Sequence, residues 1–177
     1  MSLTVTAFDL SLTSPAVASI DAAGTLRAQC GSTKNRRGPE RLVTIRDWVM
    51  FNTAGADAVT IEDLPHGLRN AAAGALGEMH GVVKVALWEA GIPFTLIPPA
   101  NLKKYATGKG NADKLAMMSA ACHRLGYDGS SSDEVDALWM VHMTLDHHGA
   151  AVIKMPALNR CALDTIDWAG TRQAVPA

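Results

Sequence analysis

The chain has 177 residues, of which 48% are hydrophobic and 19% are charged, and its net charge is −1. This length fits one domain with a hydrophobic core of its own. The near-neutral charge excludes a uniformly basic protein that coats nucleic acid, although acidic and basic patches can still cancel within a neutral total.

Neither a secretory signal nor a membrane span is expected. The N-terminus lacks a basic region, and the longest apolar stretch, residues 82–100, is interrupted by Lys84, Glu89 and three prolines. The three cysteines are widely spaced and form no C-x-x-C pair, which is typical of reduced, buried thiols. We therefore expect a protein of the cytoplasm.

The apolar pattern predicts the element order β-β-β-α-β-α-β-α-α. Short runs of apolar and β-branched residues predict strands at residues 3–8, 15–20, 25–30, 58–61 and 94–97. Helical spacing or Ala-rich composition predicts helices at residues 40–51, 68–90, 112–125 and 131–147. The first three strands form an antiparallel meander, and helices between the later strands imply parallel crossovers. The prediction is an α/β fold, a mixed five-stranded sheet flanked by helices, with residues 1–150 as the main domain. Residues 151–177 would be a strand and tail that pack on this domain or extend it.

Four acidic residues occupy unusual places in this scheme. Asp9 ends the first strand and Glu62 ends the fourth, while Asp133 and Asp136 share one face of the last helix. If the first and fourth strands are neighbours, Asp9 and Glu62 emerge at one edge of the sheet, and the last helix can approach it. Four carboxylates so close repel each other and raise their pKa values unless cations are present. Two Mg²⁺ ions, or Mn²⁺ in their place, would satisfy this need and favour phosphoryl displacement.

Each carboxylate also has a structural explanation. Asp9 could start a turn, and Glu62 could lie in a solvated loop. Asp133 could simply lie at a helix start, where Ser131 and Glu134 have the spacing of a capping box and an acidic residue in the first turn is favourable. Asp136 is the hardest to explain in this way, because it lies inside an otherwise apolar helix, where an unpartnered carboxylate is costly.

Two segments are basic. Residues 102–114 contain four lysines and two glycines, and both lysine side chains and exposed backbone amides are frequent phosphate contacts. A second basic loop lies at residues 34–37. These cations could be merely solvated, but they are the candidates for binding a polyanion: Lys103, Lys104, Lys109, Lys114, Arg36 and Arg37.

These motifs, in this strand order, resemble those of the RuvC Holliday-junction resolvases and their phage-encoded relatives in the RNase H-like superfamily. The resemblance covers residues 3–147. Residues 8–14 look like the first catalytic strand and turn, residues 59–62 like the second acidic strand, and residues 133–138 like the closing D-x-x-D-A motif. The lysine–glycine segment 102–114 is the most specific part. The chain departs from the family at Pro15, where a glycine is usual, and at Asp133, where some members have histidine. An aromatic residue that some relatives have after the second acid is replaced here by Pro65 and His66.

The resemblance implies an endonuclease that cuts Holliday and related branched DNA junctions. Asp9, Glu62, Asp133 and Asp136 would hold two Mg²⁺ or Mn²⁺ ions, and Lys103 and Lys114 would contact DNA near the scissile phosphate. It also implies a homodimer through the helix after Glu62, whose residues 71–77 are small enough for two helices to approach closely. Packing of that helix on its own sheet is the alternative explanation. A bacterial cytosolic or phage-encoded protein is expected.

Two other functions stay open. One is an RNase H-like nuclease that acts on RNA–DNA hybrids or flaps, which a comparison of substrates would separate from a resolvase. The other is a non-catalytic protein that binds junctions, and the complete acidic quartet argues against it.

Overall fold

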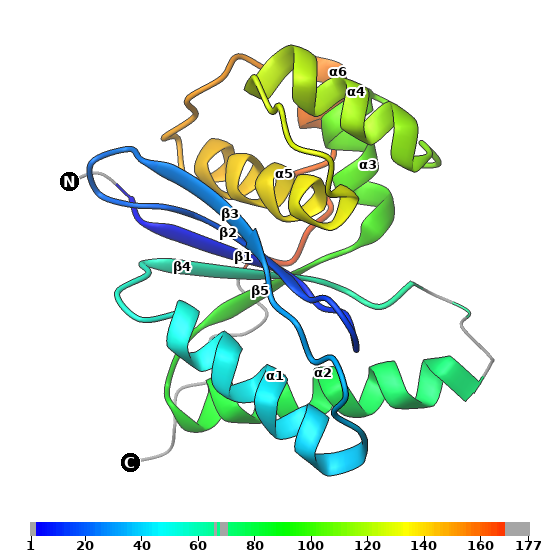
Figure 1. Ribbon diagram of the computed structural model, residues 1–177. Helices are drawn as coiled ribbons and strands as arrows, with labels where there is room; N and C mark the ends of the chain where they lie inside the picture. The colour runs from blue at the N-terminus through cyan, green and yellow to red at the C-terminus, as the bar shows by residue number, and fades with distance from the viewer. Residues whose placement is uncertain (1–2, 66, 68–70, 169–177) are drawn as a thin grey trace.

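A five-stranded sheet separates two layers of helices in the computed structural model, which describes residues 3–65, 67 and 71–168 (Figure 1). The strands are β1 (Val5–Asp9), β2 (Ala16–Ile20), β3 (Leu26–Cys30), β4 (Ala58–Glu62) and β5 (Phe94–Ile97). On one face lie α1 (Gly38–Asn52) and α2 (Ala71–Glu89). On the other lie α3 (Pro99–Thr107), α4 (Lys114–Leu125), α5 (Ser132–His147) and α6 (Ala157–Arg160).

The strand order is β3-β2-β1-β4-β5, so the sheet is mixed. The strands β1, β2 and β3 pair in antiparallel fashion, whereas β1 pairs with β4, and β4 with β5, in parallel. The predicted α/β fold with a mixed five-stranded sheet is therefore confirmed. The expectation that the first and fourth strands are neighbours is confirmed as well.

Each face of the sheet has its own core. Phe8 and Ile61, which are opposite each other in the β1–β4 register, are buried against α1 and α2. Because side chains alternate along a strand, the next residue on each strand, Asp9 on β1 and Glu62 on β4, faces the α5 layer instead.

Helix α5 is the central element of that second layer. Every residue from Ala137 to Asp146 is buried, and the side chain of Ser131 caps the helix by accepting a hydrogen bond from the backbone N–H of Glu134 (3.3 Å). The helix packs across β1 and β2. Asp136 lies in its second turn, between the buried Val135 and Ala137.

Helix α3 was not predicted from the sequence. Pro98 follows β5 directly and precedes the first turn of α3, and Pro99 is the first residue of the helix. Proline suits this position because its missing N–H has no partner in a first turn. Gly108 ends the helix with φ of 83°, a left-handed conformation that glycine adopts at low cost. Pro99 and Gly108 together are therefore the local signal that could have revealed the helix.

The segment after α5 also differs from the prediction. A strand was expected beyond residue 150, but the part described here, up to residue 168, contains the short helix α6 and turns. Met155, Leu163 and Ile166 are buried in the core that includes α5. The predicted start of the second helix, at residues 68–70, lies outside the described residues. The expectation of buried thiols is wrong, because all three cysteines, Cys30, Cys122 and Cys161, are exposed. No helix in the described ranges has the length and hydropathy that crossing a membrane requires.

One buried histidine predicts a pH dependence of stability. His142 of α5 is 5% exposed, and both its ring nitrogens lack a hydrogen-bond partner among the described residues. Burial lowers the pKa of His142 to about 4. Between about pH 6.5 and 4 the unfolded chain therefore binds a proton at this residue that the folded chain does not, so stability falls as the pH falls.

We expect His142→Leu to weaken this acid destabilisation by an amount on the order of 3 kcal/mol at pH 4. The measurement is urea unfolding of both proteins at several pH values from 4 to 7. His123→Leu, at an exposed position of α4, is the matched control and should keep the wild-type slope. An equal slope in the His142 variant would contradict the assignment.

Candidate active site and metal centre

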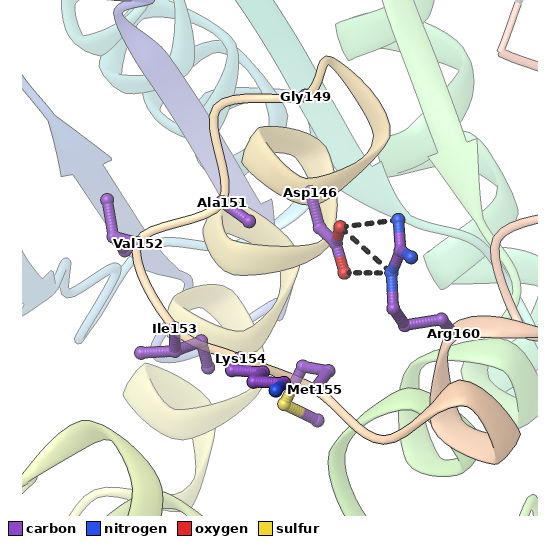
Figure 2. A pocket seen from close by; sticks show the side chains of 8 residues that line it. All are labelled: Asp146, Gly149, Ala151, Val152, Ile153, Lys154, Met155 and Arg160. Carbon is purple, nitrogen blue, oxygen red and sulfur yellow. Dashed lines mark hydrogen bonds and ion pairs between the residues drawn. The ribbon is translucent and has the colours of Figure 1, made fainter.

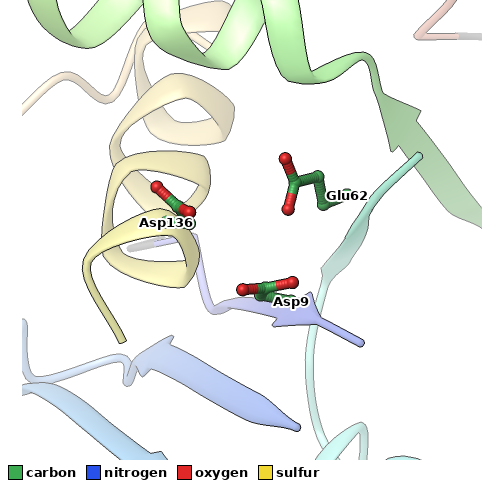
Figure 3. Close-up of side chains that lie close together, drawn as sticks. All are labelled: Asp9, Glu62 and Asp136. Carbon is green, nitrogen blue, oxygen red and sulfur yellow. The ribbon is translucent and has the colours of Figure 1, made fainter. Parts of the chain in front are cut away.

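Three carboxylates from three elements meet at one edge of the sheet. Asp9 ends β1, Glu62 ends β4 and Asp136 lies on α5, and their side chains point toward one another (Figure 3). One carboxylate oxygen from each lies within 4.8 Å of the others. The parallel β1–β4 register sets the first two side by side, and the packing of α5 on β1 supplies the third.

Burial and mutual repulsion raise the proton affinity of this group. Burial, followed by the charge of Asp133, raises the pKa of Asp9 to about 6. Burial and then the neighbouring carboxylates Asp9 and Asp136 raise the pKa of Glu62 well above its usual value. Burial, followed by the charge of Asp9, raises the pKa of Asp136 to about 7. The geometry therefore concentrates negative charge in a place where water solvates it poorly.

Asp133, the fourth predicted carboxylate, stands beside the triad and not within it. Its carboxylate lies 3.8 Å from the Lys114 ammonium and accepts a hydrogen bond of 3.1 Å from the Ser132 hydroxyl. The Lys114 ammonium also donates to Ser132 (3.3 Å). The predicted quartet is thus observed as a triad with a fourth carboxylate one helical turn away. Ser132 is an additional polar residue of the site that sequence reasoning missed, and its place between the capping serine and Asp133 was the signal.

Two of the predicted lysines lie beside the acidic group. Positive charge on Lys103 lowers the pKa of both Glu62 and Asp136, and that on Lys114 lowers the pKa of Asp9 and Asp136, in each case against the larger effect of burial. Lys103 reaches the site because α3 starts directly after β5, at the same edge of the sheet as Glu62. The edge is therefore acidic at its centre and basic at its margin.

The other predicted basic residues have different surroundings. Lys104 lies half-buried on α3, and Lys109 is exposed after it. Arg36 turns back onto α1, where its guanidinium donates to the Thr44 hydroxyl and lies 3.9 Å from Glu40. These contacts hold the Arg36 side chain against α1 and stabilise that helix. Arg37 is the exposed residue that precedes the first turn of α1. Pro65, where the family places an aromatic residue in some relatives, is exposed, and His66 lies outside the described residues.

The triad fits a hard divalent cation. Mg²⁺ and Mn²⁺ prefer carboxylate oxygens, and three half-buried carboxylates with raised pKa values converge here. A bound cation would relieve both the repulsion and the lost hydration. Asp9, Glu62 and Asp136 are the residues that could hold it, with Asp133 near enough to take part.

A protein-family model described as crossover junction endodeoxyribonuclease RuvC matches residues 16–143. The chain belongs to the RuvC family. The matched range contains Glu62, the lysine–glycine segment and Asp136, while Asp9 lies just before it.

Two relatives described as crossover junction endodeoxyribonuclease RuvC have similar sequences. The protein from Anaeromyxobacter sp. (strain Fw109-5) is 32% identical over 133 residues, which are 74% of this chain and 64% of the relative. The protein from Sorangium cellulosum (strain So ce56) is 33% identical over 118 residues, 63% of this chain and 65% of the relative. The matched part of the chain thus spans somewhat less than two thirds of the length of these relatives.

Solved RuvC structures share the fold. Thermus thermophilus RuvC superposes with a TM-score of 0.63 at 22% identity, over 87% of this chain and all of that one. The same protein in complex with Holliday junction substrate gives 0.66 at 23% identity, over 87% and 99% of the two chains. The fowlpox virus Holliday junction resolvase gives 0.52 at 11% identity, over 81% and 98%. At these identities the likeness establishes the RNase H-like fold of the RuvC family.

The raised pKa values predict how the metal-free protein responds to pH. In the folded state Asp9 and Asp136 retain protons up to about pH 6 and 7, whereas free aspartate loses its proton near pH 3.9. Without metal, these two residues therefore make the folded state less stable as the pH rises from about 4 through about 7. The buried His142, whose pKa is lowered to about 4, makes the folded state more stable as the pH rises, so a fall in stability between pH 6.5 and 8 reports the carboxylates.

In EDTA, we expect the melting temperature to fall between pH 6.5 and 8, and saturating Mg²⁺ or Mn²⁺ to raise it by roughly 5–10 °C at pH 8. The rise should be smaller at pH 6, where protons compete with the metal. Asp136→Asn should melt higher than wild type in EDTA at pH 8 and should lose most of the metal effect. Differential scanning calorimetry gives each of these melting temperatures. A wild-type melting temperature insensitive to the metal at pH 8 would count against a metal centre here.

Proposed function

We propose that this chain is a metal-dependent endonuclease that resolves four-way and related branched DNA junctions by hydrolysing phosphodiester bonds. The observation that supports the proposal most directly is the triad of Asp9, Glu62 and Asp136, with Lys103 and Lys114 beside it. The family description, crossover junction endodeoxyribonuclease, agrees with this site. The Thermus homologue of the same fold has been solved with Holliday junction substrate, which supports branched DNA as the ligand.

The carboxylates would hold two Mg²⁺ ions, or Mn²⁺ in their place. When bound, such ions make water a better nucleophile and stabilise negative charge on the leaving 3′ oxygen. Asp9 and Glu62 are on neighbouring strands of a rigid sheet, and Asp136 is on a buried helix, so these ligands are held in place before DNA binds. Asp133, one turn before Asp136, lies close to Lys114, and its carboxylate would be free to turn toward the metal ions when they bind.

The lysines would act on the DNA. A phosphodiester that approaches the acidic edge meets like charge, and Lys103 and Lys114 offset that repulsion at the margin of the site. Lysine ammonium groups near a reacting phosphate also stabilise the charge that develops in the transition state. Lys104 and Lys109 extend this basic surface along α3 and the turn after it.

We also propose that the chain acts as a homodimer through the α1–α2 face. A groove of about 490 Å³ runs between these helices, lined by apolar residues that include Leu42, Val82 and Val85 and by the charged Arg46, Glu78 and Glu89. Val85 is 54% exposed and the nearby Trp88 is 43% exposed. A Cβ atom added at Gly74 or Gly77 would meet no described atom within 4 Å, so these glycines do not serve close packing within the chain. Small residues with open space around them would allow a second α2 helix to pack closely against this one. A two-fold dimer would then supply two active sites for a two-fold symmetric junction.

The carboxylates should be needed for cleavage and not for binding. Asp136→Asn removes a metal ligand while preserving shape, so cleavage of a labelled synthetic four-way junction in Mg²⁺ should fall by several orders of magnitude. Gel-shift affinity for the junction should be kept or improved, because one charge that repels DNA is lost. The same is expected for Asp9→Asn, Glu62→Gln and, with a smaller loss, Asp133→Asn.

Asp47→Asn on α1, whose side chain is 61% exposed, is the control and should cleave as wild type. RNA–DNA hybrids and flaps serve as competing substrates in the same assay. Preferred cleavage of either would replace the resolvase proposal with the other nuclease, and cleavage retained by the Asp136 variant would exclude the triad as the active site.

The dimer has its own test. Light scattering of the wild type should give about twice the 18.7 kDa mass of the chain. Gly74→Leu or Gly77→Leu should give a folded monomer, since the added side chain has room in one chain but blocks the approach of a second α2. Ser119→Leu on the exposed face of α4 adds the same side chain elsewhere and should leave the mass unchanged. Dimers that persist in both glycine variants would rule out this face.

A further inference from the structure

The segment after α5 makes direct contacts with α3, the helix that contains Lys103. Residues 144–168 lie beyond the range that the family model matches. Asn159 of α6 is 5% exposed and donates from its side-chain amide to the backbone carbonyl of Tyr105 (2.7 Å). At the other end of α3, the amide of Asn101 donates to the carbonyl of Ala162 (2.7 Å) and to the hydroxyl of Thr165 (2.7 Å). The tail thus holds α3 at both ends.

An ion pair between a buried carboxylate and an exposed guanidinium anchors the tail itself. Asp146, near the end of α5, is 5% exposed and accepts hydrogen bonds from the Arg160 guanidinium at 3.0 and 3.1 Å, on the wall of a cavity (Figure 2). The same carboxylate accepts a hydrogen bond from the Tyr105 hydroxyl (3.0 Å). Tyr105 is therefore fixed through its hydroxyl by α5 and through its carbonyl by α6.

Helix α3 needs such external support. It has nine residues, fewer than an isolated helix requires for stability, and no side chain caps its first turn. The carbonyl of Tyr105 is one of the four at its end that have no partner within the helix, and Asn159 satisfies it. Lys103 lies between the two tethered residues, Asn101 and Tyr105. Its ammonium is close enough to Glu62 and Asp136 to influence both.

We propose that residues 155–168 position α3 for catalysis, with Asn159 and the Asn101 tether holding Lys103 at the edge of the carboxylate triad. Asn101 and Asn159 are then positioning residues that act through Lys103. This inference rests on the proposed function, because it gives Lys103 a part in cleavage. It assigns the tail a specific task beyond filling the core.

The test uses Asn101→Ala and Asn159→Leu in the full chain. Asn101 is half-buried, so its variant should fold even if Asn159→Leu does not. Asn52→Ala is the matched control, because Asn52 also donates from its amide to a helix carbonyl, that of Trp48 (2.7 Å), but on the opposite face of the sheet. Hydrogen exchange is measured on the metal-free proteins, and single-turnover cleavage of a four-way junction is measured in Mg²⁺ at saturating protein.

We expect amide exchange in α3 to become about fivefold to tenfold faster in Asn101→Ala and Asn159→Leu, with exchange in β1 unchanged. Their cleavage rate should fall about tenfold, while junction affinity stays within twofold and Asn52→Ala cleaves as wild type. The decisive comparison adds Asn101→Ala to Lys103→Ala. If Asn101 acts through Lys103, the double variant should cleave no more slowly than Lys103→Ala alone.

A tail that only stabilises the fold would lower the melting temperature and leave the cleavage rate unchanged well below it, and that result would overturn the proposal. The proposal would also be overturned if Asn101→Ala slowed cleavage by the same factor in the wild type and in the Lys103→Ala variant. Unchanged exchange in α3 would show that the tail does not hold this helix, whatever the enzyme cleaves. A wild-type protein that cuts no branched DNA would instead defeat the proposed function, and the catalytic part of this inference with it.

Discussion

The structure depends on the convergence of negative charge at the carboxyl edge of the sheet. Carboxylate oxygens of Asp9, Glu62 and Asp136 lie within 4.8 Å of one another in a place that water reaches poorly. Such a group is unfavourable by itself, because desolvation and repulsion act in the same direction. The surrounding architecture supplies what offsets it. Lys103 and Lys114 stand at the margin, and the oxygen ligands match those of a divalent cation.

Helix α5 connects this edge to the rest of the molecule. Its first two turns contain Asp133 and Asp136, its middle is buried in the core, and Asp146 near its end bonds to Tyr105 and Arg160. A helix buried along most of its length moves little, so the position of Asp136 relative to β1 is set by packing. The same helix fixes α3 through Tyr105. One rigid element thus determines where both Asp136 and the basic helix α3 lie.

The two faces of the sheet divide the proposed tasks. The site residues face or belong to the α3–α6 layer, which includes the basic helix, whereas the apolar groove and the open glycines belong to the α1–α2 layer. We therefore expect substitutions in the α3–α6 layer to change cleavage and substitutions in the α1–α2 layer to change assembly. The register of β1 against β4 links the layers, since Phe8 and Ile61 point to one face and the catalytic candidates that follow them point to the other.

The amino-acid sequence alone determined the strands, four of the principal helices and the four acidic positions. These features rest on signals within short windows, such as the apolar run before Asp9 or the carboxylate inside an apolar helix at Asp136. Tertiary structure decided three matters that such windows do not contain. It separated Asp133 from the triad, because distances across a sheet edge follow from register and helix packing. It showed that Gly74 and Gly77 have open space around them, which requires knowing what lies opposite. It also revealed α3, a helix too short to be stable by itself, because the bonds that hold it come from Asn159 and its neighbours more than fifty residues later in the chain.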